Sequence, residues 1–443
     1  MKKKAALHNL GCKVNAYEVE AMQQLLEKAG YEIVPFEEGA DIYLINTCTV
    51  TNIADRKSRQ MLHKAKKMNP DAIVVATGCY VQTDTQKLEA DSAVDLILGN
   101  NQKKQIVEAL EEYEKEHAKK VKVIEINKTK EYEDLSIGYT AEHVRAYIKV
   151  QDGCNQFCTY CIIPYARGRV RSRKIAEVLE EVRTLAARGY KEVVLTGIHL
   201  SSYGLDFPKE ERESLLSLIQ AVHEVDGIAR IRLGSLEPRI ITEEFMEGIS
   251  ALPKLCPHFH LSLQSGCDKT LKNMNRRYSA PEYAEKCELI RKFYPAPALT
   301  TDVIVGFPME TEEDFEDSYE FVKNIHFYET HIFKYSRRQG TKAAAMNGQL
   351  TEAVKAQRSE KMLKLHEIRA KEYETSMIGR TLELLLEEEV EIGGKTYFMA
   401  HSKEYVRAVI EKTDAHKVND LVKAKAVDFA DEHVLLAICE DLY

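Results

Sequence analysis

The chain lacks several features that would narrow its class at once. It has no tryptophan, and no apolar run approaches the ~20 residues of a membrane-spanning helix, so we expect no membrane association. The basic residues 1–4 are followed by a stretch too short and too polar for a secretory signal, which predicts a cytoplasmic protein. Its net charge of −8 does not favour nucleic-acid binding, so any such function must rest on local basic patches.

Ten cysteines stand out against these absences. In a reducing compartment they indicate metal binding or catalysis rather than disulfides. Three of them fall in residues 154–161, Cys-Asn-Gln-Phe-Cys-Thr-Tyr-Cys, directly after a strand-like run at 144–150. Thiolates select soft metals, and an iron–sulfur cluster is the leading candidate. Because a four-iron cluster normally takes four cysteines, three would leave one iron open, which is typical of a reactive site.

A zinc knuckle is the alternative interpretation of this loop. It is weaker, because the nearest candidate for a fourth ligand, Tyr165, is a poor one and no histidine follows closely. The loop therefore favours a cluster held by Cys154, Cys158 and Cys161.

Three further cysteines each follow an apolar run in the first 117 residues. Cys12, Cys48 and Cys79 are separated by helical stretches, so the segment reads as a β-α-β-α-β alternation and predicts an open parallel α/β domain. The carboxyl ends of parallel strands share one edge, so we expect the three thiols to converge there. Buried structural cysteines are the alternative, but three at equivalent strand ends favour a second three-thiolate site.

Six strand-like runs alternate with helical stretches between residues 142 and 373, after a linker at 118–141. This pattern predicts an incomplete (β/α)6 barrel, whose functional residues lie at the carboxyl ends of the strands. The strands are expected at 144–150, 192–196, 230–234, 259–263, 299–305 and 330–335. Polar or glycine-rich turns follow several of them and include Gly197, Ser235, Glu237 and Gln264.

Two basic segments could contact phosphates. One is the helix at 56–67, for which a solvated face is the usual explanation. The other places five positive charges just after the cysteine loop and could form a phosphate-contacting arm, with solvated loop arginines as the alternative. Its members are Arg167, Arg169, Arg171, Arg173 and Lys174.

The last segment, 376–443, consists of short alternating runs with turn residues between them. Five such strands predict a small closed β-barrel, a shape often used to bind nucleic acid, although this segment is acidic.

These motifs together resemble the methylthiotransferase family over essentially the whole chain. Residues 11–15 (Gly-Cys-Lys-Val-Asn), 46–50 (Asn-Thr-Cys-Thr-Val) and 77–79 (Thr-Gly-Cys) are similar to its amino-terminal domain. Residues 153–161 resemble its radical S-adenosylmethionine (SAM) loop, and 263–266, 274–278, 302–308 and 340–341 agree as well. The tail resembles the family's TRAM domain. Met309 departs from the pattern, because the family usually has glycine there.

The resemblance implies a radical SAM transferase with two four-iron, four-sulfur clusters, one on each cysteine triad. One SAM would give a 5′-deoxyadenosyl radical, sulfur would enter a carbon–hydrogen bond, and a second SAM would supply the methyl group. Tyr160, Gly197, Ser235, Glu237 and Gln264 are the candidates for binding SAM. An electron donor such as a flavodoxin or ferredoxin, and a sulfur donor, would be partners.

Residues 11–18 look most like the branch that modifies threonylcarbamoyladenosine at position 37, in the anticodon loop of tRNA. The alternatives are isopentenyladenosine in tRNA or an aspartate of ribosomal protein S12. A protein of another class, a non-catalytic RNA-binding protein with structural clusters, is disfavoured because two open irons indicate reactivity.

Overall fold

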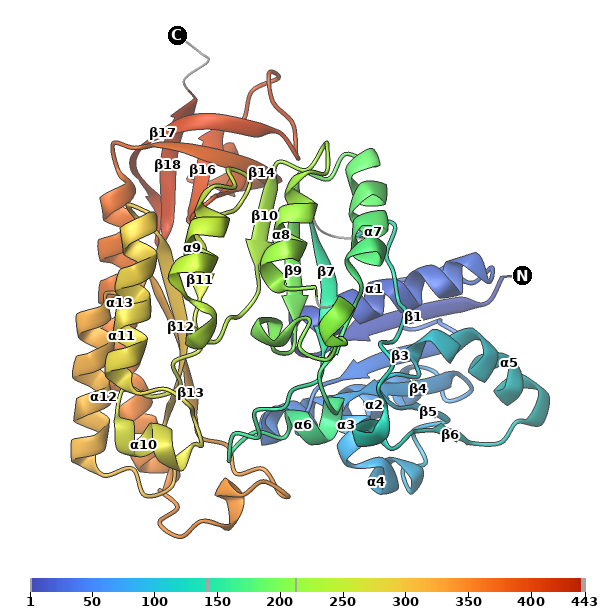
Figure 1. Ribbon diagram of the computed structural model, residues 1–443. Helices are drawn as coiled ribbons and strands as arrows, with labels where there is room; N and C mark the ends of the chain where they lie inside the picture. Colours follow the sequence, from blue (N-terminus) through green and yellow to red (C-terminus); the bar gives the residue numbers. More distant parts are fainter. Residues whose placement is uncertain (1, 141–143, 212, 440–443) are drawn as a thin grey trace.

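The computed structural model describes residues 2–140, 144–211 and 213–439 and arranges them in three parts (Figure 1). The predicted α/β class is confirmed: a parallel α/β domain comes first, a half-open barrel follows, and a strand-rich module ends the chain. Two predicted boundaries, residue 142 and the end of the terminal module at 440–443, lie outside the described residues.

The amino-terminal domain is one six-stranded sheet in the order β2-β1-β3-β4-β5-β6, and every neighbouring pair is parallel. Its central strands are fully buried apolar runs, as expected for a parallel sheet covered on both faces. The last strand lies in the segment predicted as a linker. The elements are β1 (Lys4–Asn9), α1 (Lys13–Lys28), β2 (Glu32–Ile33), β3 (Ile42–Thr47), α2 (Asn52–Met68), β4 (Ile73–Gly78), α3 (Cys79–Thr83), α4 (Thr85–Glu89), β5 (Leu96–Leu98), α5 (Ile106–Glu116) and β6 (Lys120–Lys122).

The central part contains all six predicted strands, as two sheets. One has the order β10-β9-β7-β8 and the other β11-β12-β13. Single parallel bridges, Ile231 to Leu255 and Leu236 to Leu261, connect the two sheets, which produces the half-open barrel. The strands are β7 (Arg145–Asp152), β8 (Arg171–Ser172), β9 (Glu192–Gly197), β10 (Arg230–Leu233), β11 (His258–His260), β12 (Ala298–Val305) and β13 (Glu329–Lys334). The short antiparallel β8 was not predicted.

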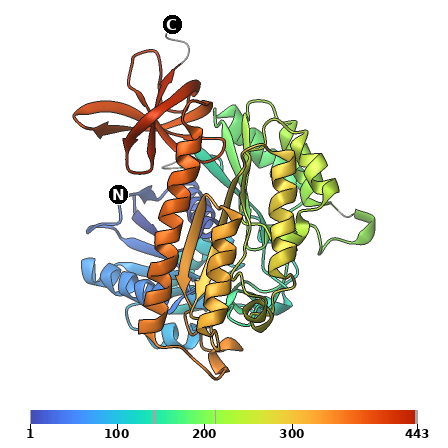
Figure 2. The same ribbon diagram turned by 90° about the vertical axis from the view of Figure 1, so that its left-hand side faces the viewer.

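Helices cover the outer face of this half-barrel, and Figure 2 shows α13 running along it toward the terminal module. Capping boxes begin α8, α11 and α12, each with a Ser or Thr side chain accepting from the third helical N–H. The helices are α6 (Ile163–Arg167), α7 (Ile175–Ala187), α8 (Leu215–His223), α9 (Glu243–Ser250), α10 (Asp268–Asn273), α11 (Ala280–Phe293), α12 (Glu312–Ile325) and α13 (Glu352–Met377). Short 3-10 turns lie at Lys103–Gln105, Ile126–Lys128, Leu200–Ser202, Lys209–Glu211, Pro238–Ile240 and Ala343–Ala345.

The predicted five-stranded closed barrel is confirmed, with the order β14-β15-β16-β18-β17. Alternate inward residues of its strands form a separate core with Met377 at the end of α13. Its strands are β14 (Thr381–Ile392), β15 (Lys395–Ser402), β16 (Arg407–Glu411), β17 (Leu421–Asp431) and β18 (Val434–Cys439). None of the helices within the described residues combines the length and apolar character needed to cross a bilayer.

Two buried arginines of β10 attach this closed barrel to the central part. Arg230 donates to the carbonyl oxygen of His401 at 3.0 Å, and Arg232 donates to that of Lys403 at 2.9 Å. Glu192 of β9 holds Arg232 through a 2.8 Å ion pair. The neighbouring guanidinium groups lower the pKa of Glu192 to about 2 despite its burial, so the carboxylate stays charged.

We expect Arg232→Met to destabilise the protein by about 3 kcal/mol, because it leaves Glu192 buried with a weaker partner. The control is Lys412→Met, which removes a solvent-exposed pair with Glu389 and should cost less than ~1 kcal/mol. Thermal unfolding would measure both changes, and hydrogen exchange of β15 amides would report loosened docking. Equal effects of the two substitutions would contradict the role given to Arg232.

Candidate functional site

The amino-terminal cysteines meet at one edge of the sheet. Cys48 and Cys79 directly follow β3 and β4, and Cys12 lies three residues after the end of β1, as the alternation predicted. Gly11 has a φ of 110°, and a Cβ atom there would lie 3.0 Å from the Cys48 sulfur, so the two loops touch. Because only glycine fits such a contact and such a φ, the motif around Cys12 is also a packing requirement.

These thiols lie in an environment suited to a metal cluster. Cys48 and Cys79 are buried, whereas Cys12 is exposed. Burial, and then the neighbouring Cys79, raise the pKa of Cys48 to about 12. A metal that binds here must therefore displace the thiol protons. Two N–H donors reach the Cys79 sulfur, Arg167 Nε at 3.1 Å and Asn100 Nδ2 at 3.8 Å.

The second triad lies in the loop between β7 and α6. Cys158 accepts from Arg276 Nη1 at 3.3 Å, and Cys154 accepts from the backbone N–H of Gln156 at 3.5 Å. Burial raises the pKa of Cys154 to about 11 and that of Cys161 to about 12. Such N–H donors favour thiolate sulfur, so both triads fit iron–sulfur clusters. Local sequence gives no sign that Arg276 is a donor, because it lies 118 residues from Cys158.

A glycine fixes where this second loop begins. Gly153 has a φ of 73°, and a Cβ atom there would fall 1.8 Å from the carbonyl oxygen of Arg169. Asn275 holds the middle of the loop by donating to the Phe157 carbonyl at 3.1 Å. The contacts of Gly153 and Asn275 therefore fix the conformation of the loop without a bound cofactor.

One cavity of about 290 Å³ lies between the two cysteine loops. Val50 and Thr51, just after Cys48, line one side, and Tyr160 with Cys161 lines another. Gln264, which follows β11, and Asp302, within β12, contribute polar atoms to the wall. A substrate in this cavity would touch both loops at once.

The five residues predicted to bind SAM lie at several different places around the half-barrel. Tyr160 and Gln264 line the cavity, and Gln264 has a left-handed φ of 72°. Glu237 is buried, pairs with Arg239 at 2.7 Å, and acts electrostatically on Cys154. Gly197 packs against Gln151, and Ser235 is exposed at the end of β10. Their assignment to SAM stays a prediction.

The predicted phosphate-contacting arm is wrong for three of its five members. Arg167, Arg171 and Arg173 are 0%, 0% and 3% exposed, so they cannot reach an external phosphate. They pair instead with carboxylates of other elements: Arg167 with Glu18, Arg171 with Asp152, and Arg173 with Glu181. The residues that flank these arginines in the sequence do not indicate their carboxylate partners. Of the five, Arg169 alone is exposed, and Lys174 is half-buried.

Two family models match the chain. Residues 4–99 match the uncharacterized protein family UPF0004, and residues 148–322 match the radical SAM superfamily. The radical SAM methyltransferase TsrM from Kitasatospora setae has a similar fold, with a TM-score of 0.56 at 16% identity over 75% of this chain and 73% of its own. The fold and the site define a radical SAM enzyme with an added amino-terminal domain.

Curated relatives then identify the family. The threonylcarbamoyladenosine tRNA methylthiotransferase MtaB of Bacillus subtilis is 41% identical over 95% of this chain and 93% of its own length. The Aquifex aeolicus enzyme of the same name is 43% identical over 87% and 93%. A tRNA-2-methylthio-N(6)-dimethylallyladenosine synthase from Moorella thermoacetica is 37% identical over 85% of each chain. The chain therefore belongs to the radical SAM tRNA methylthiotransferase family and is a transferase, which confirms the resemblance predicted from its motifs.

The anaerobically reconstituted protein should hold about eight iron atoms per chain, four on each triad. Cys48→Ala should reduce the content to about four, because a cluster left with two thiolates is not retained. The control is Cys267→Ala, a buried cysteine in neither triad, which should keep the full content. Iron analysis of the three proteins decides the matter, and equal content in all of them would contradict a cluster on Cys12, Cys48 and Cys79.

Proposed function

We propose that this chain converts N6-threonylcarbamoyladenosine at position 37 of tRNA to its 2-methylthio derivative, in the cytoplasm. The observation that carries the proposal is a cavity lined by residues next to Cys48 on one side and by Cys161 on the other. When bound, a cluster on Cys154, Cys158 and Cys161 with SAM supplies the radical chemistry, and a cluster on Cys12, Cys48 and Cys79 supplies the sulfur chemistry. The names of the most similar curated relatives support this branch over the others.

The chain's own residues would hold the adenine between the two loops. The cavity has an apolar wall that includes Tyr160, Ile304 and Phe333, which suits the flat face of a base. Gln264 and Asp302 offer hydrogen-bonding atoms for its edge. A base in a single-stranded loop enters such a cavity with little unstacking cost, and an anticodon loop meets that condition.

Further assignments belong to the same proposal. The division into units 1–117, 142–373 and 376–443, joined by the linker 118–141, follows the sequence pattern. The closed barrel would serve as a TRAM domain that contacts tRNA. A flavodoxin or ferredoxin would deliver electrons, and a separate donor would replace the consumed sulfur.

Deletion of the gene, followed by mass spectrometry of nucleosides from total tRNA, tests this function. We expect 2-methylthio-threonylcarbamoyladenosine to disappear, while 2-methylthio-isopentenyladenosine and ribosomal protein S12 stay modified. Loss of either of those modifications instead would assign the chain to a sister branch. No change in any of the three would favour a non-catalytic RNA-binding protein.

A lysine beside the first triad could recognise the threonylcarbamoyl group, whose carboxylate needs a cationic contact. Lys13 directly follows Cys12, and its side chain lies within electrostatic reach of His258 and Glu329 in the half-barrel. Desolvation by the surrounding walls, and then Arg232, lower its pKa. The carboxylates of Glu192 and Glu329 act on the pKa of Lys13 in the opposite direction but do not offset this effect. An anionic substrate group would fill this place.

We expect Lys13→Met to weaken binding of an anticodon stem-loop that carries threonylcarbamoyladenosine by about tenfold, because one charge-assisted hydrogen bond is lost. Affinity for the same RNA with unmodified adenosine should not change, and Lys13→Arg should restore most of the difference. Titration of the iron-loaded proteins with both RNAs gives the comparison. Equal weakening for both RNAs would make Lys13 a general RNA contact.

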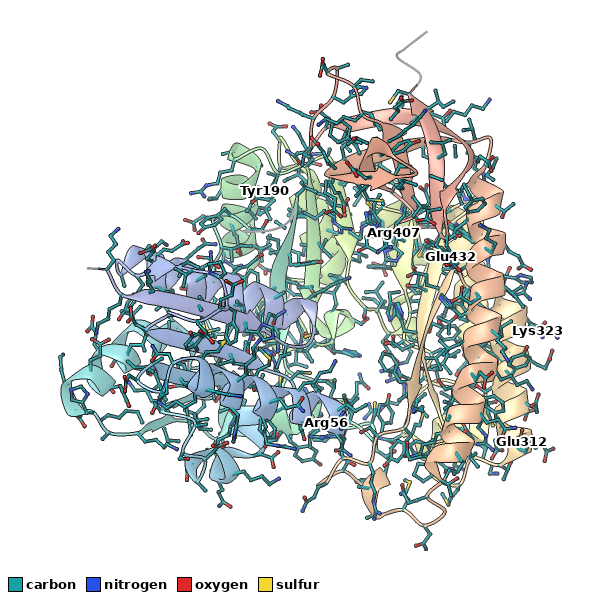
Figure 3. The ribbon with its side chains drawn as sticks, turned by 180° about the vertical axis from the view of Figure 1, so that it is seen from behind. Arg56, Tyr190, Glu312, Lys323, Arg407 and Glu432 are labelled. Carbon is teal, nitrogen blue, oxygen red and sulfur yellow. The ribbon has the colours of Figure 1, made fainter. Side chains whose placement is uncertain are left out.

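An exposed aromatic and basic patch borders the second cysteine loop. It consists of the exposed Tyr165 and Arg169 with the half-buried Phe157 of the loop itself, and the Arg169 guanidinium lies 4.5 Å from the Phe157 ring centre. Tyr165 is 44% exposed and also borders a hollow of about 660 Å³ that Arg59 of α2 lines from the other side. Figure 3 labels Arg56 on the same end of α2, close to the half-barrel. Aromatic faces with nearby cations are typical of single-stranded RNA binding.

Arg169→Glu should weaken tRNA binding and lower the slope of log affinity against log salt by about 0.7 to 0.9 for each lost phosphate contact. Tyr165→Ala should weaken binding by about 1–3 kcal/mol, because a base loses its stacking partner, with little change in that slope. The matched control is Arg183→Glu, an exposed position on the outer helix α7. Salt-dependent binding titrations measure all three. If Arg169→Glu and Arg183→Glu behave alike, the patch is not the RNA-contacting surface.

A further inference from the structure

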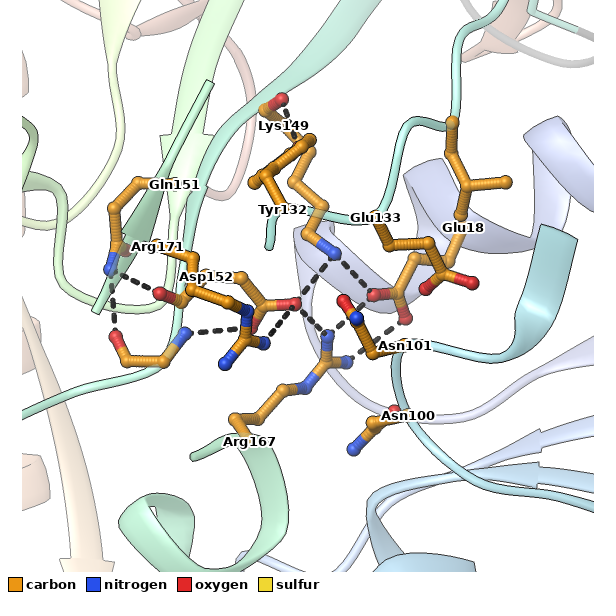
Figure 4. Close-up of polar contacts among 12 residues, drawn as sticks. Glu18, Asn100, Asn101, Tyr132, Glu133, Lys149, Gln151, Asp152, Arg167 and Arg171 are labelled. Carbon is orange, nitrogen blue, oxygen red and sulfur yellow. Dashed lines mark hydrogen bonds and ion pairs between the residues drawn. The ribbon is translucent and has the colours of Figure 1, made fainter. Parts of the chain in front are cut away.

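The buried arginine that touches the first triad belongs to the helix that follows the second. Arg167 ends α6, six residues after Cys161, and its side chain is fully buried (Figure 4). Its Nε donates to the Cys79 sulfur at 3.1 Å, its Nη2 to Glu18 at 3.0 Å, and its Nη1 lies 3.3 Å from Asp152. One guanidinium thus connects the Cys79 sulfur, helix α1 and strand β7.

The charges around Arg167 do not balance without the cysteine sulfurs. Lys103 lies 3.1 Å and Lys149 2.8 Å from Glu18, and Lys149 also lies 2.7 Å from Asp152. Arg171 lies 3.6 Å from Asp152, and its Nε has no hydrogen-bond partner among the described residues. Four buried cations therefore surround two carboxylates. Because buried charge is costly unless it is compensated, the surplus indicates an anion at this place.

The sulfur of Cys79 is the acceptor that Arg167 reaches, and thiolates that hold a cluster carry negative charge. We propose that Arg167 positions the cluster on Cys12, Cys48 and Cys79 and raises its reduction potential. One-electron reduction adds a negative charge to the cluster, and both the nearby cation and the N–H···S hydrogen bond stabilise the reduced form. The inference rests on the proposed assignment of these three cysteines as cluster ligands.

Arg167 also connects the two cysteine loops, because it follows Cys161 closely in the chain and contacts the Cys79 sulfur. Residues 162–167 connect Cys161 directly to the guanidinium, and the Asn100 amide, which also approaches the Cys79 sulfur, donates to the Ala166 carbonyl at 2.7 Å. The loop that carries the radical SAM triad therefore sets where the donor to the other triad lies. Electron entry at the first triad depends on the correct folding of the second loop.

A redox titration of the full-length enzyme with both clusters, followed by electron paramagnetic resonance, tests the proposal. Dithionite supplies the electrons, and a variant with Cys154, Cys158 and Cys161 changed to Ala identifies the signal of the other cluster. Arg167→Lys keeps a positive charge beside Glu18 but removes the planar donor to sulfur. We expect about a tenfold loss in the equilibrium constant for reducing the cluster on Cys79, which is ~59 mV toward lower potential.

The matched control is Arg173→Lys. Arg173 is also buried, pairs with the buried Glu181 of α7 and donates to the Tyr17 hydroxyl of α1 at 3.5 Å, but among the described residues it contacts no cysteine sulfur. Arg173→Lys should leave the reduction potential of the cluster on Cys79 unchanged, while it lowers the stability of the protein by a similar amount. Asn100→Ser, which removes the longer N–H contact to the same sulfur, should shift the potential less and in the same direction.

The possible results distinguish a wrong role for Arg167 from a wrong assignment of the cluster ligands. An unchanged potential in Arg167→Lys, or the same shift in Arg173→Lys, overturns the proposal. If Arg167→Lys does not fold, an unchanged potential in Asn100→Ser overturns it. If the unsubstituted protein shows no second cluster signal at all, the assignment of Cys12, Cys48 and Cys79 fails, and with it the proposed function rather than the role of Arg167 alone.

Discussion

A buried cluster of charges between α1, β7 and α6 fixes the amino-terminal domain against the half-barrel. Glu18 supplies its centre, with Arg167 and Lys149 reaching it from the central part of the chain. The surrounding cations hold the pKa of Glu18 well below its usual range even though burial alone would raise it. Because each cysteine triad belongs to a different part, the width of the cavity between them depends on this junction.

The main effect of this junction is to fix the position of the amino-terminal domain, and its net contribution to the free energy of folding is small. Buried ion pairs recover little net free energy after desolvation, but they tolerate little displacement. Two further contacts hold the same domain at other points. Tyr17 donates to Glu181 at 3.1 Å, and Arg338 joins the start of α2 through Asp55 at 2.6 Å. Three separate attachments restrict rocking of one cysteine loop relative to the other, and a reaction between two fixed centres needs this restriction.

The sequence predicted those features whose signal is local. Strand alternation and cysteine spacing placed both triads at strand ends, because each loop directly follows its own strand. It failed for Arg167, whose partner Glu18 lies 149 residues away, since a run of arginines looks the same on a surface and in a buried cluster. Met309 shows the opposite case: the motif pattern predicted glycine at this position, and its φ of 66° is the left-handed conformation that favours glycine.

Part of the attachment of the terminal barrel runs through its backbone. Arg230 and Arg232 donate to carbonyl oxygens of residues 401–403, and every amino acid presents that oxygen. The side chains on the far surface of the barrel can therefore change during evolution without undoing the attachment. Related enzymes that act on different RNAs could keep one docking geometry while the outward face of this module diverges.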